Sequence, residues 1–216
     1  MPISENLLAH FTPEGYFHII CKCIDGKTLF KTDENRSYFL KRYHDFLFDF
    51  ADTYAYCLLD NHVHWFVKIK PEQELIQMLK KQLHLTITHK KFLENKCSFH
   101  ELIEQQFNRF FISYSLAYNI SLSIKGHLFS RPFKRIELSD DAHITQLIIY
   151  MHANAQKHGI CKDFSTYRWS SYSSILSDRY SSLKRAEVLE WFGGRERFID
   201  IHQQQASNFR HLFSGE

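Results

Sequence analysis

Two strand-like runs separated by a tight turn constrain the fold of this chain more than any other feature. Residues 53–59 (TYAYCLL) and 63–70 (VHWFVKIK) are rich in β-branched and aromatic residues, and Asp60 and Asn61 between them are typical turn residues. Strands joined this closely pair antiparallel, because a parallel pair needs a long crossover. The sequence therefore predicts an antiparallel hairpin.

Further strands and helices are expected on both sides of this hairpin. Strands are predicted at residues 16–23 (YFHIICKC) and 133–138. The spacing of apolar residues predicts helices over residues 33–50, 71–82, 101–118, 140–158 and 186–192. Strands and helices alternate and the strands are few. We therefore expect an α+β fold, in which helices cover one or both faces of a small, mainly antiparallel sheet.

Local signals mark the ends of several of these segments. Asp33 is a candidate helix cap, and Asp140 or Asp141 is another, while Gly159 is expected to stop the helix that begins there. Asp25-Gly26 is a turn signal. Residues 84–100 are polar and poorly patterned, and we expect them to form a mobile insert.

Composition excludes several classes of protein. The 216 residues contain no apolar run near the roughly 18 needed to span a membrane, and the first residues do not resemble a secretory signal. Five cysteines without a C-x-x-C motif indicate neither a disulfide framework nor a structural zinc site. We therefore expect a soluble, cytoplasmic protein without a membrane partner. A net charge of +3 only weakly favours a polyanionic partner.

The sharpest local motif is Asn61-His62-Val63-His64-Trp65, at the start of a predicted strand. Side chains two apart on a strand share a face, with Cα atoms about 6.6 Å apart. His62 and His64 can therefore converge on one divalent cation while Val63 and Trp65 enter a core. The same pattern also fits two ordinary histidines at a strand end.

A second motif is Tyr150 with Asn154 in the segment IIYMHANAQKHG. Residues four apart on a helix share a face, so a phenol and a carboxamide would project together. Alone, the pair also fits a half-buried tyrosine and a surface amide. His152 lies off this face, and we expect it to pack or to form hydrogen bonds.

Together these motifs resemble a known family. NHVH on the third strand, G-H-L-F-x-R-x-F-K after a long helix, and then Y-x-H-x-N-x-x-K-H-G are similar in content and order to the single-tyrosine transposases of the HUH class. The resemblance is strongest to the REP-associated (IS200-like) tyrosine transposases and covers residues 14–175. It implies a ferredoxin-like or RRM-like palm, with a catalytic domain at residues 1–178 and a C-terminal helical extension at residues 179–216.

The resemblance also implies roles for single residues. His62 and His64 match the metal-binding pair, Asn154 matches the third ligand, and Tyr150 matches the nucleophile. The implied metal is Mg²⁺ or Mn²⁺, and nitrogen ligands with one amide oxygen suit either ion. Ala155 departs from the family, which usually has proline there, so the helix end can differ.

Basic residues near these motifs are candidate DNA contacts. Lys68 and Lys70 are expected on the histidine face by strand alternation, and Phe129 and Phe133 are candidates for stacking on unpaired bases. A second basic cluster, which a solvated surface would also explain, comprises Lys125, His127, Arg131, Lys134 and Arg135. The expected partner is single-stranded or hairpin DNA, such as an inverted repeat of the REP type, bound by a monomer or a homodimer.

Three functions fit the sequence. The resemblance implies a strand transferase that nicks DNA through a 5′-phosphotyrosine and rejoins strands. The second is a domesticated, non-catalytic binder of hairpin DNA with the same fold. The third is an unrelated metal-dependent hydrolase that uses H-x-H and needs no tyrosine.

Overall fold

The computed structural model describes residues 7–24 and 27–205, and the expected turn at Asp25-Gly26 lies outside them. The strands are β1 (Tyr16–Lys22), β2 (Ala51–Leu58), β3 (His62–Ile69) and β4 (Lys134–Leu138). The helices are α1 (Asp33–Leu47), α2 (Glu72–Lys81), α3 (Ile87–Leu93), α4 (Phe99–Ser121), α5 (Asp141–Lys157), α6 (Tyr172–Ile175), α7 (Arg185–Trp191) and α8 (Arg195–Gln205), with a short 3₁₀ segment η1 (Phe164–Thr166).

The four strands form one antiparallel sheet in the order β2-β3-β1-β4. Ile20 of the central strand β1 pairs with His64 of β3 on one side and with Lys134 of β4 on the other. Helices follow and separate these strands. The predicted α+β class with a small antiparallel sheet is confirmed.

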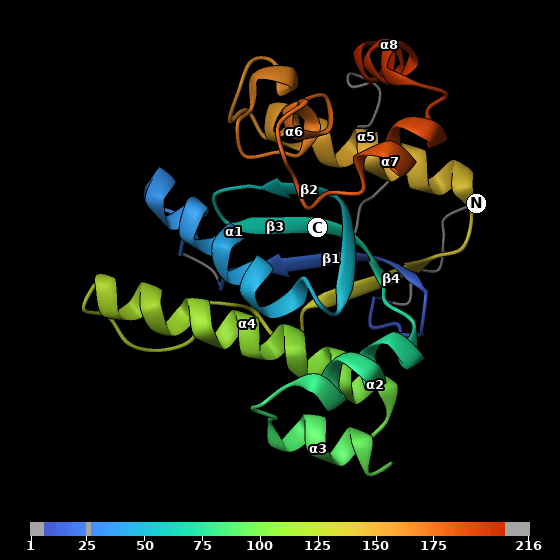
Figure 1. The fold of residues 1–216 in the computed structure, drawn as a ribbon. Helices are drawn as coiled ribbons and strands as arrows, with labels where there is room; N and C mark the ends of the chain where they lie inside the picture. Colours follow the sequence, from blue (N-terminus) through green and yellow to red (C-terminus); the bar gives the residue numbers. More distant parts are fainter. Residues whose placement is uncertain (1–6, 25–26, 206–216) are drawn as a thin grey trace.

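Helices cover both faces of the sheet (Figure 1). On one face, α1 and α4 pack against each other and against β1 and β3, with Phe39, Phe107 and Phe110 in the shared core. On the other face, α5 packs on β2, and α6, α7 and α8 lie beyond it. The sheet is therefore the middle layer of three.

Alternation along β3 divides its side chains between the two cores. Val63 and Trp65 belong to the core with α1 and α4, where the Trp65 ring stacks on Tyr43 at a centroid distance of 4.9 Å. Phe66 belongs to the opposite core, with α5. The prediction that Val63 and Trp65 enter a core is confirmed, and it leaves His62 and His64 on the α5 face.

Helix boundaries differ from the expected ones where a nearby side chain makes a better cap. Thr32 rather than Asp33 caps α1, because its hydroxyl accepts a hydrogen bond from the Asn35 N–H at 3.3 Å. The helix ends at Leu47 instead of residue 50, since β2 begins at Ala51. Asp140 caps α5 as expected, accepting from the Ala142 N–H at 2.9 Å.

Residues 84–100, expected as a mobile insert, contain helix α3. Thr86 caps it by accepting a hydrogen bond from the His89 N–H at 3.1 Å. Phe92 and His89 are buried, and the His89 ring lies 3.4 Å from the Gln106 side chain of α4. Packing on α4 therefore supplies stability that seven polar-rich residues lack by themselves.

The C-terminal helices share a core with α5. Val188 and Phe192 at α7 and Phe198 of α8 pack in the same hydrophobic cluster as Leu147 and Met151 of α5. The division at residue 178 stays a prediction, but the described part of residues 179–216 is packed onto the preceding segment. Helix α8 lies within the C-terminal helical extension that the resemblance implies, although its few apolar positions did not predict its bounds.

A buried chain of polar side chains fastens α8 to α5. The His202 Nδ1–H donates to the Phe198 carbonyl at 2.7 Å, so its Nε2 accepts from His152 Nδ1–H at 2.8 Å. His152 Nε2 in turn accepts from the Ser171 hydroxyl at 2.7 Å. The expectation that His152 forms hydrogen bonds is confirmed.

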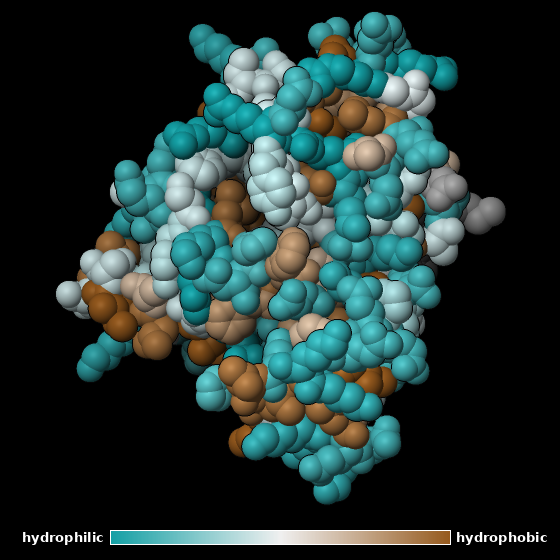
Figure 2. Space-filling view, in the orientation of Figure 1, coloured by the Kyte–Doolittle hydropathy of each residue, from teal (hydrophilic) through white to brown (hydrophobic). Residues whose placement is uncertain are grey.

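Most of the surface seen in Figure 2 is hydrophilic, with apolar residues gathered near the end of α4 and around α2 and α3. On α4 these are Ile112, Leu116 and Ile120. Among the helices of the described ranges, none is both long and apolar enough to cross a membrane.

The His202 link predicts a loss of stability in mild acid. Burial lowers the pKa of His202 from its ordinary 6.5 to about 4, so the folded state resists protonation more than the unfolded chain does. Above pH 6.5 His202 is neutral in both states and the protein has its full stability. As the pH falls from 6.5 towards 4, only the unfolded chain takes up the proton, so the free energy of unfolding should fall by about 3 kcal/mol. Urea denaturation across this range should show the loss.

The matched variant is His202→Gln, with His127→Gln on the surface as its control. His202→Gln should be less stable at neutral pH and should lose much less stability on acidification, whereas His127→Gln should follow the wild type. Parallel losses in His202→Gln and the wild type would contradict the assignment.

Candidate active site

β3 brings His62 and His64 together on the α5 face of the sheet. His62 pairs with Lys22 of β1, and His64 pairs with Ile20. The two imidazole centroids lie 4.9 Å apart with their planes nearly perpendicular. Both side chains are buried, at 5% and 0% exposure, so their positions are fixed by packing.

α5 presents a row of side chains at four-residue spacing towards these histidines. The Tyr150 ring lies 6.0 Å from the His64 ring, and the Asn154 Nδ2 lies 2.9 Å from the His64 Nε2. One turn further, at the end of the helix, the His158 ring lies 5.3 Å from the His62 ring. The helical spacing therefore places a phenol, an amide and an imidazole on one face, as expected for the first two.

His18 of β1 completes the buried row, although it belongs to no motif in the sequence. Its Nε2 lies 2.9 Å from the His64 Nδ1, and the side chain is 2% exposed. His18 lies one residue pair diagonally from His64, on the same face of the sheet. Alternation along β1 determines the face of the sheet on which His18 lies, but only the pairing of β1 with β3 brings His18 beside His64.

The hydrogen bonds determine where His64 carries its proton. The amide nitrogen of Asn154 only donates, so the His64 Nε2 accepts and its Nδ1–H donates to His18. Burial holds the pKa of His64 well below its ordinary value, with further lowering from the charges of His18 and His62. His64 is therefore neutral near pH 7 and directs an unshared electron pair at Asn154.

Tyr150 lies at the edge of this row and is 1% exposed. The Lys157 Nζ, two turns along α5, lies over its ring at 4.8 Å from the centroid. This cation–π contact and the edge-to-face contact with His64 hold the ring between β3 and the end of α5.

The structure separates the two lysines expected on the histidine face. Lys68 lies near the far end of β3, where its Nζ is 5.4 Å from the Tyr16 ring centroid and 3.9 Å from a Glu14 oxygen. Lys70 follows the end of β3 and donates to the Glu74 side chain of α2 at 2.9 Å. The expectation for Lys70 is wrong, because the chain leaves the strand before this residue and alternation no longer applies.

The second basic cluster follows the segment between α4 and β4. Lys125, His127 and Arg131 are exposed on that segment. Lys134 begins β4, beside Ile20 and one strand further from His64. Of these four residues, Lys134 is therefore the one that strand pairing places near the histidines, while the other three lie on the exposed segment before β4.

Arg135 and two phenylalanines do not fit the DNA-contacting roles considered for them. Arg135 is 5% exposed, donates to the Ala9 carbonyl at 2.7 Å and pairs with Glu104 at 3.0 Å. Phe129 and Phe133 are buried in the core with α4. Alternation explains the difference, because Arg135 points to the opposite face of β4 from Lys134.

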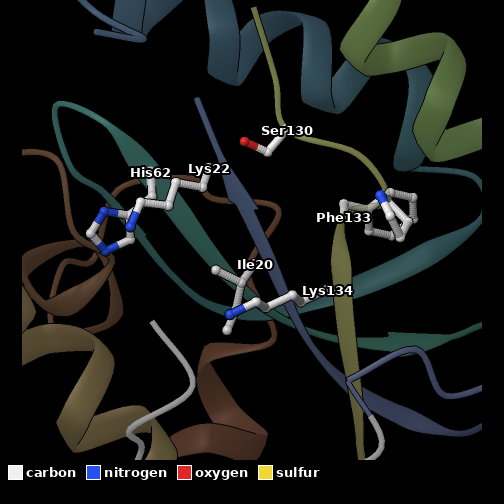
Figure 3. A pocket seen from close by; sticks show the side chains of 7 residues that line it. Ile20, Lys22, His62, Ser130, Phe133 and Lys134 are labelled. Carbon is white, nitrogen blue, oxygen red and sulfur yellow. The ribbon is translucent and has the colours of Figure 1, made fainter. Parts of the chain in front are cut away.

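A small cavity of about 120 Å³ opens beside His62 (Figure 3). Lys22 and Lys134 lie at its border, while Ile20 and Phe133 supply apolar walls. Across the described parts of the chain, no three or more His, Cys, Asp or Glu side chains cluster as metal ligands. The two histidines and the Asn154 amide, the three ligands that the sequence resemblance implies, are nevertheless close together here.

The buried amide predicts a cost for its removal. Asn154→Ala removes the partner of the buried His64 Nε2, which should lower the free energy of unfolding by about 1–3 kcal/mol. Asn108→Ala, inside α4 and half-buried, makes the same change in helix propensity and is the matched control. Urea denaturation at neutral pH compares them, and equal stability of the two variants would contradict the role of this hydrogen bond.

One solved structure resembles this chain as a whole. It is a REP-associated tyrosine transposase bound to a REP hairpin, and it matches with a TM-score of 0.52 over 83% of this chain and 90% of that one. The sequences are 13% identical, so the similarity shows the fold alone. No protein-family model matches the sequence, and the search of curated proteins found no match. The chain thus has the fold of a tyrosine transposase.

Proposed function

We propose that this chain is a DNA strand transferase that nicks single-stranded or hairpin DNA through a covalent bond to Tyr150 and then rejoins strands. The observation that carries the proposal is the convergence of Tyr150 and Asn154 of α5 with His62 and His64 of β3. The tyrosine transposase fold supports it further. DNA is the proposed partner because the neighbour was solved with a REP hairpin and because Lys22 and Lys134 line the same cavity as His62.

The donor atoms fit a divalent ion held by His62, His64 and Asn154. The His64 Nε2 and the Asn154 amide are 2.9 Å apart. Adjacent ligands of an octahedral ion with bonds of about 2.1 Å lie about 3 Å apart, so turning the amide to present its oxygen matches this spacing. His18 supplies the outer hydrogen bond that orients a metal-bound imidazole. Bound Mg²⁺ or Mn²⁺ would neutralise charge on a phosphodiester and orient its phosphorus.

Tyr150 is the nucleophile in this proposal. Its phenolic oxygen loses its proton to water and forms a bond to phosphorus, the P–O3′ bond breaks, and the leaving 3′-oxygen takes a proton from water to become a hydroxyl. The product is a 5′-phosphotyrosine. Because phenoxide leaves more readily than an alkoxide, a DNA 3′-hydroxyl can reverse the step and join a strand without an external energy source.

The burial of Tyr150 adds a conformational step. At 1% exposure its hydroxyl cannot meet a phosphodiester on the surface, so DNA binding has to open the contacts around its ring. The Lys157 Nζ lies 4.8 Å from the ring centroid, and its long, flexible side chain can keep this contact when the ring moves.

The two other candidate functions require different subsets of these residues. A non-catalytic hairpin binder needs the basic surface but neither Tyr150 nor the histidines. A metal-dependent hydrolase needs the histidines and leaves no covalent adduct. The presence of the tyrosine within the histidine and amide cluster favours the transferase.

The tyrosine test compares two buried phenols. Tyr150→Phe removes one oxygen and should abolish the covalent protein–DNA adduct while fold and DNA affinity are nearly unchanged. Tyr114→Phe is the control, because the Tyr114 hydroxyl donates to the Leu29 carbonyl within the α4 core and should not affect the adduct. A denaturing gel of labelled hairpin DNA with a single-stranded tail reads the result. An adduct that persists in Tyr150→Phe, or disappears only in Tyr114→Phe, would show that the nucleophile is another residue.

The metal test removes either the ligands or the ion. His62→Ala and His64→Ala should each lower cleavage by at least about 100-fold, since each removes a ligand that positions the ion. EDTA should have the same effect on the wild type, and added Mg²⁺ or Mn²⁺ should restore cleavage. His143→Ala, near the opposite end of α5, is the matched control and should cleave normally. Full cleavage by the wild type in excess EDTA would rule out the metal.

A further inference from the structure

The cavity beside His62 has no role in the strand-transfer chemistry itself, and its lining indicates what it can hold. Ile20, Pro132 and Phe133 supply apolar surface, and Ser130 and His62 supply polar atoms. At about 120 Å³ it is well below the roughly 300–1,000 Å³ of sites that enclose a drug-sized molecule. It therefore suits one ring system of a larger ligand, with the remainder outside.

Two lysines at the border of the cavity indicate the charge of the part of the ligand that stays outside it. Lys22 ends β1 opposite His62, and Lys134 begins β4 opposite Ile20. Figure 3 shows Lys22 and Lys134 on the two sides of Ile20, with His62 beyond Lys22. A ligand with a flat, mostly apolar ring and negative charge on both sides of it matches this order, and a nucleotide within a DNA strand has this form.

We propose that this cavity receives a single unpaired base of the DNA strand, while Lys22 and Lys134 contact the phosphates that flank it. This inference rests on the proposed function and adds to it a binding site for one nucleotide next to the reacting phosphate. The base enters between Ile20 and the edge of Phe133, and Ser130 and His62 are the residues that offer polar atoms to it. The cavity thereby positions the strand with respect to His62.

The site also selects the form of the DNA. A base stacked and paired in a duplex cannot enter a cavity, and extracting it costs unstacking energy that an unpaired base does not require. A preference for unpaired DNA over duplex DNA therefore follows from the shape of the cavity and does not depend on which bases the strand contains.

The experiment measures binding in EDTA, so that cleavage does not contribute. The probe is a fluorescein-labelled DNA hairpin with a short oligothymidine tail, in which an abasic sugar replaces each tail nucleotide in turn. Fluorescence anisotropy should show the largest loss, about tenfold, at one tail position. Ile20→Trp fills the cavity and should weaken binding of the intact probe by a similar factor while removing the abasic effect at that position. Ile87→Trp, which makes the same change at an exposed position of α3 outside the cavity, is its matched control and should behave as the wild type.

Two further measurements keep the test decisive if Ile20→Trp does not fold. In the wild type, 5-iodouracil at the sensitive position should photo-crosslink to the peptide that contains Phe133. Lys22→Gln and Lys134→Gln should each weaken binding more than Lys41→Gln, which changes an exposed lysine of α1 that pairs with Asp45. Failure of the wild type to bind the probe would refute the proposed function. Binding that is insensitive to every abasic position, or a crosslink elsewhere, would overturn the cavity proposal alone.

Discussion

The hydrogen-bonded row His18–His64–Asn154 is the interaction on which the arrangement of the site depends. It runs from the central strand β1, through β3, to α5, with both contacts at 2.9 Å and all three side chains buried. A buried imidazole without partners would destabilise the fold, so the row has to form when the α5 layer packs on the sheet. The position of α5, and with it that of Tyr150, is therefore tied to the ring of His64.

A second polar chain holds α5 from its other side. His152 points away from the sheet to His202 of α8 and to Ser171, while Asn154, two residues later, points to His64. α5 thus carries buried hydrogen bonds in two directions within one turn, and sliding or rotating it would break both sets. This explains physically how a helix can present a tyrosine at a fixed place relative to two histidines on a strand.

Local periodicity predicted the parts of this account that depend on neighbours in sequence. The hairpin, the shared face of His62 and His64 and the four-residue spacing from Tyr150 to Asn154 all follow from strand and helix geometry. His18 and His202 were beyond such reasoning, because strand pairing and helix packing between distant segments put them in contact with His64 and His152. Lys70 and Arg135 were misplaced for the same reason, since a strand end and a buried ion pair with Glu104 override the pattern.

The proposed metal centre, held by His62, His64 and Asn154, would lie beside Tyr150. Pulsed electron paramagnetic resonance of Mn²⁺ bound to the full chain tests it most directly, because imidazole nitrogens coupled to the ion appear in the spectrum. If this site holds the ion, Mn²⁺ should couple to two histidine nitrogens in the wild type and to one histidine nitrogen in His62→Ala and in His64→Ala. Bound Mn²⁺ without nitrogen coupling, or coupling unchanged in both variants, would contradict it.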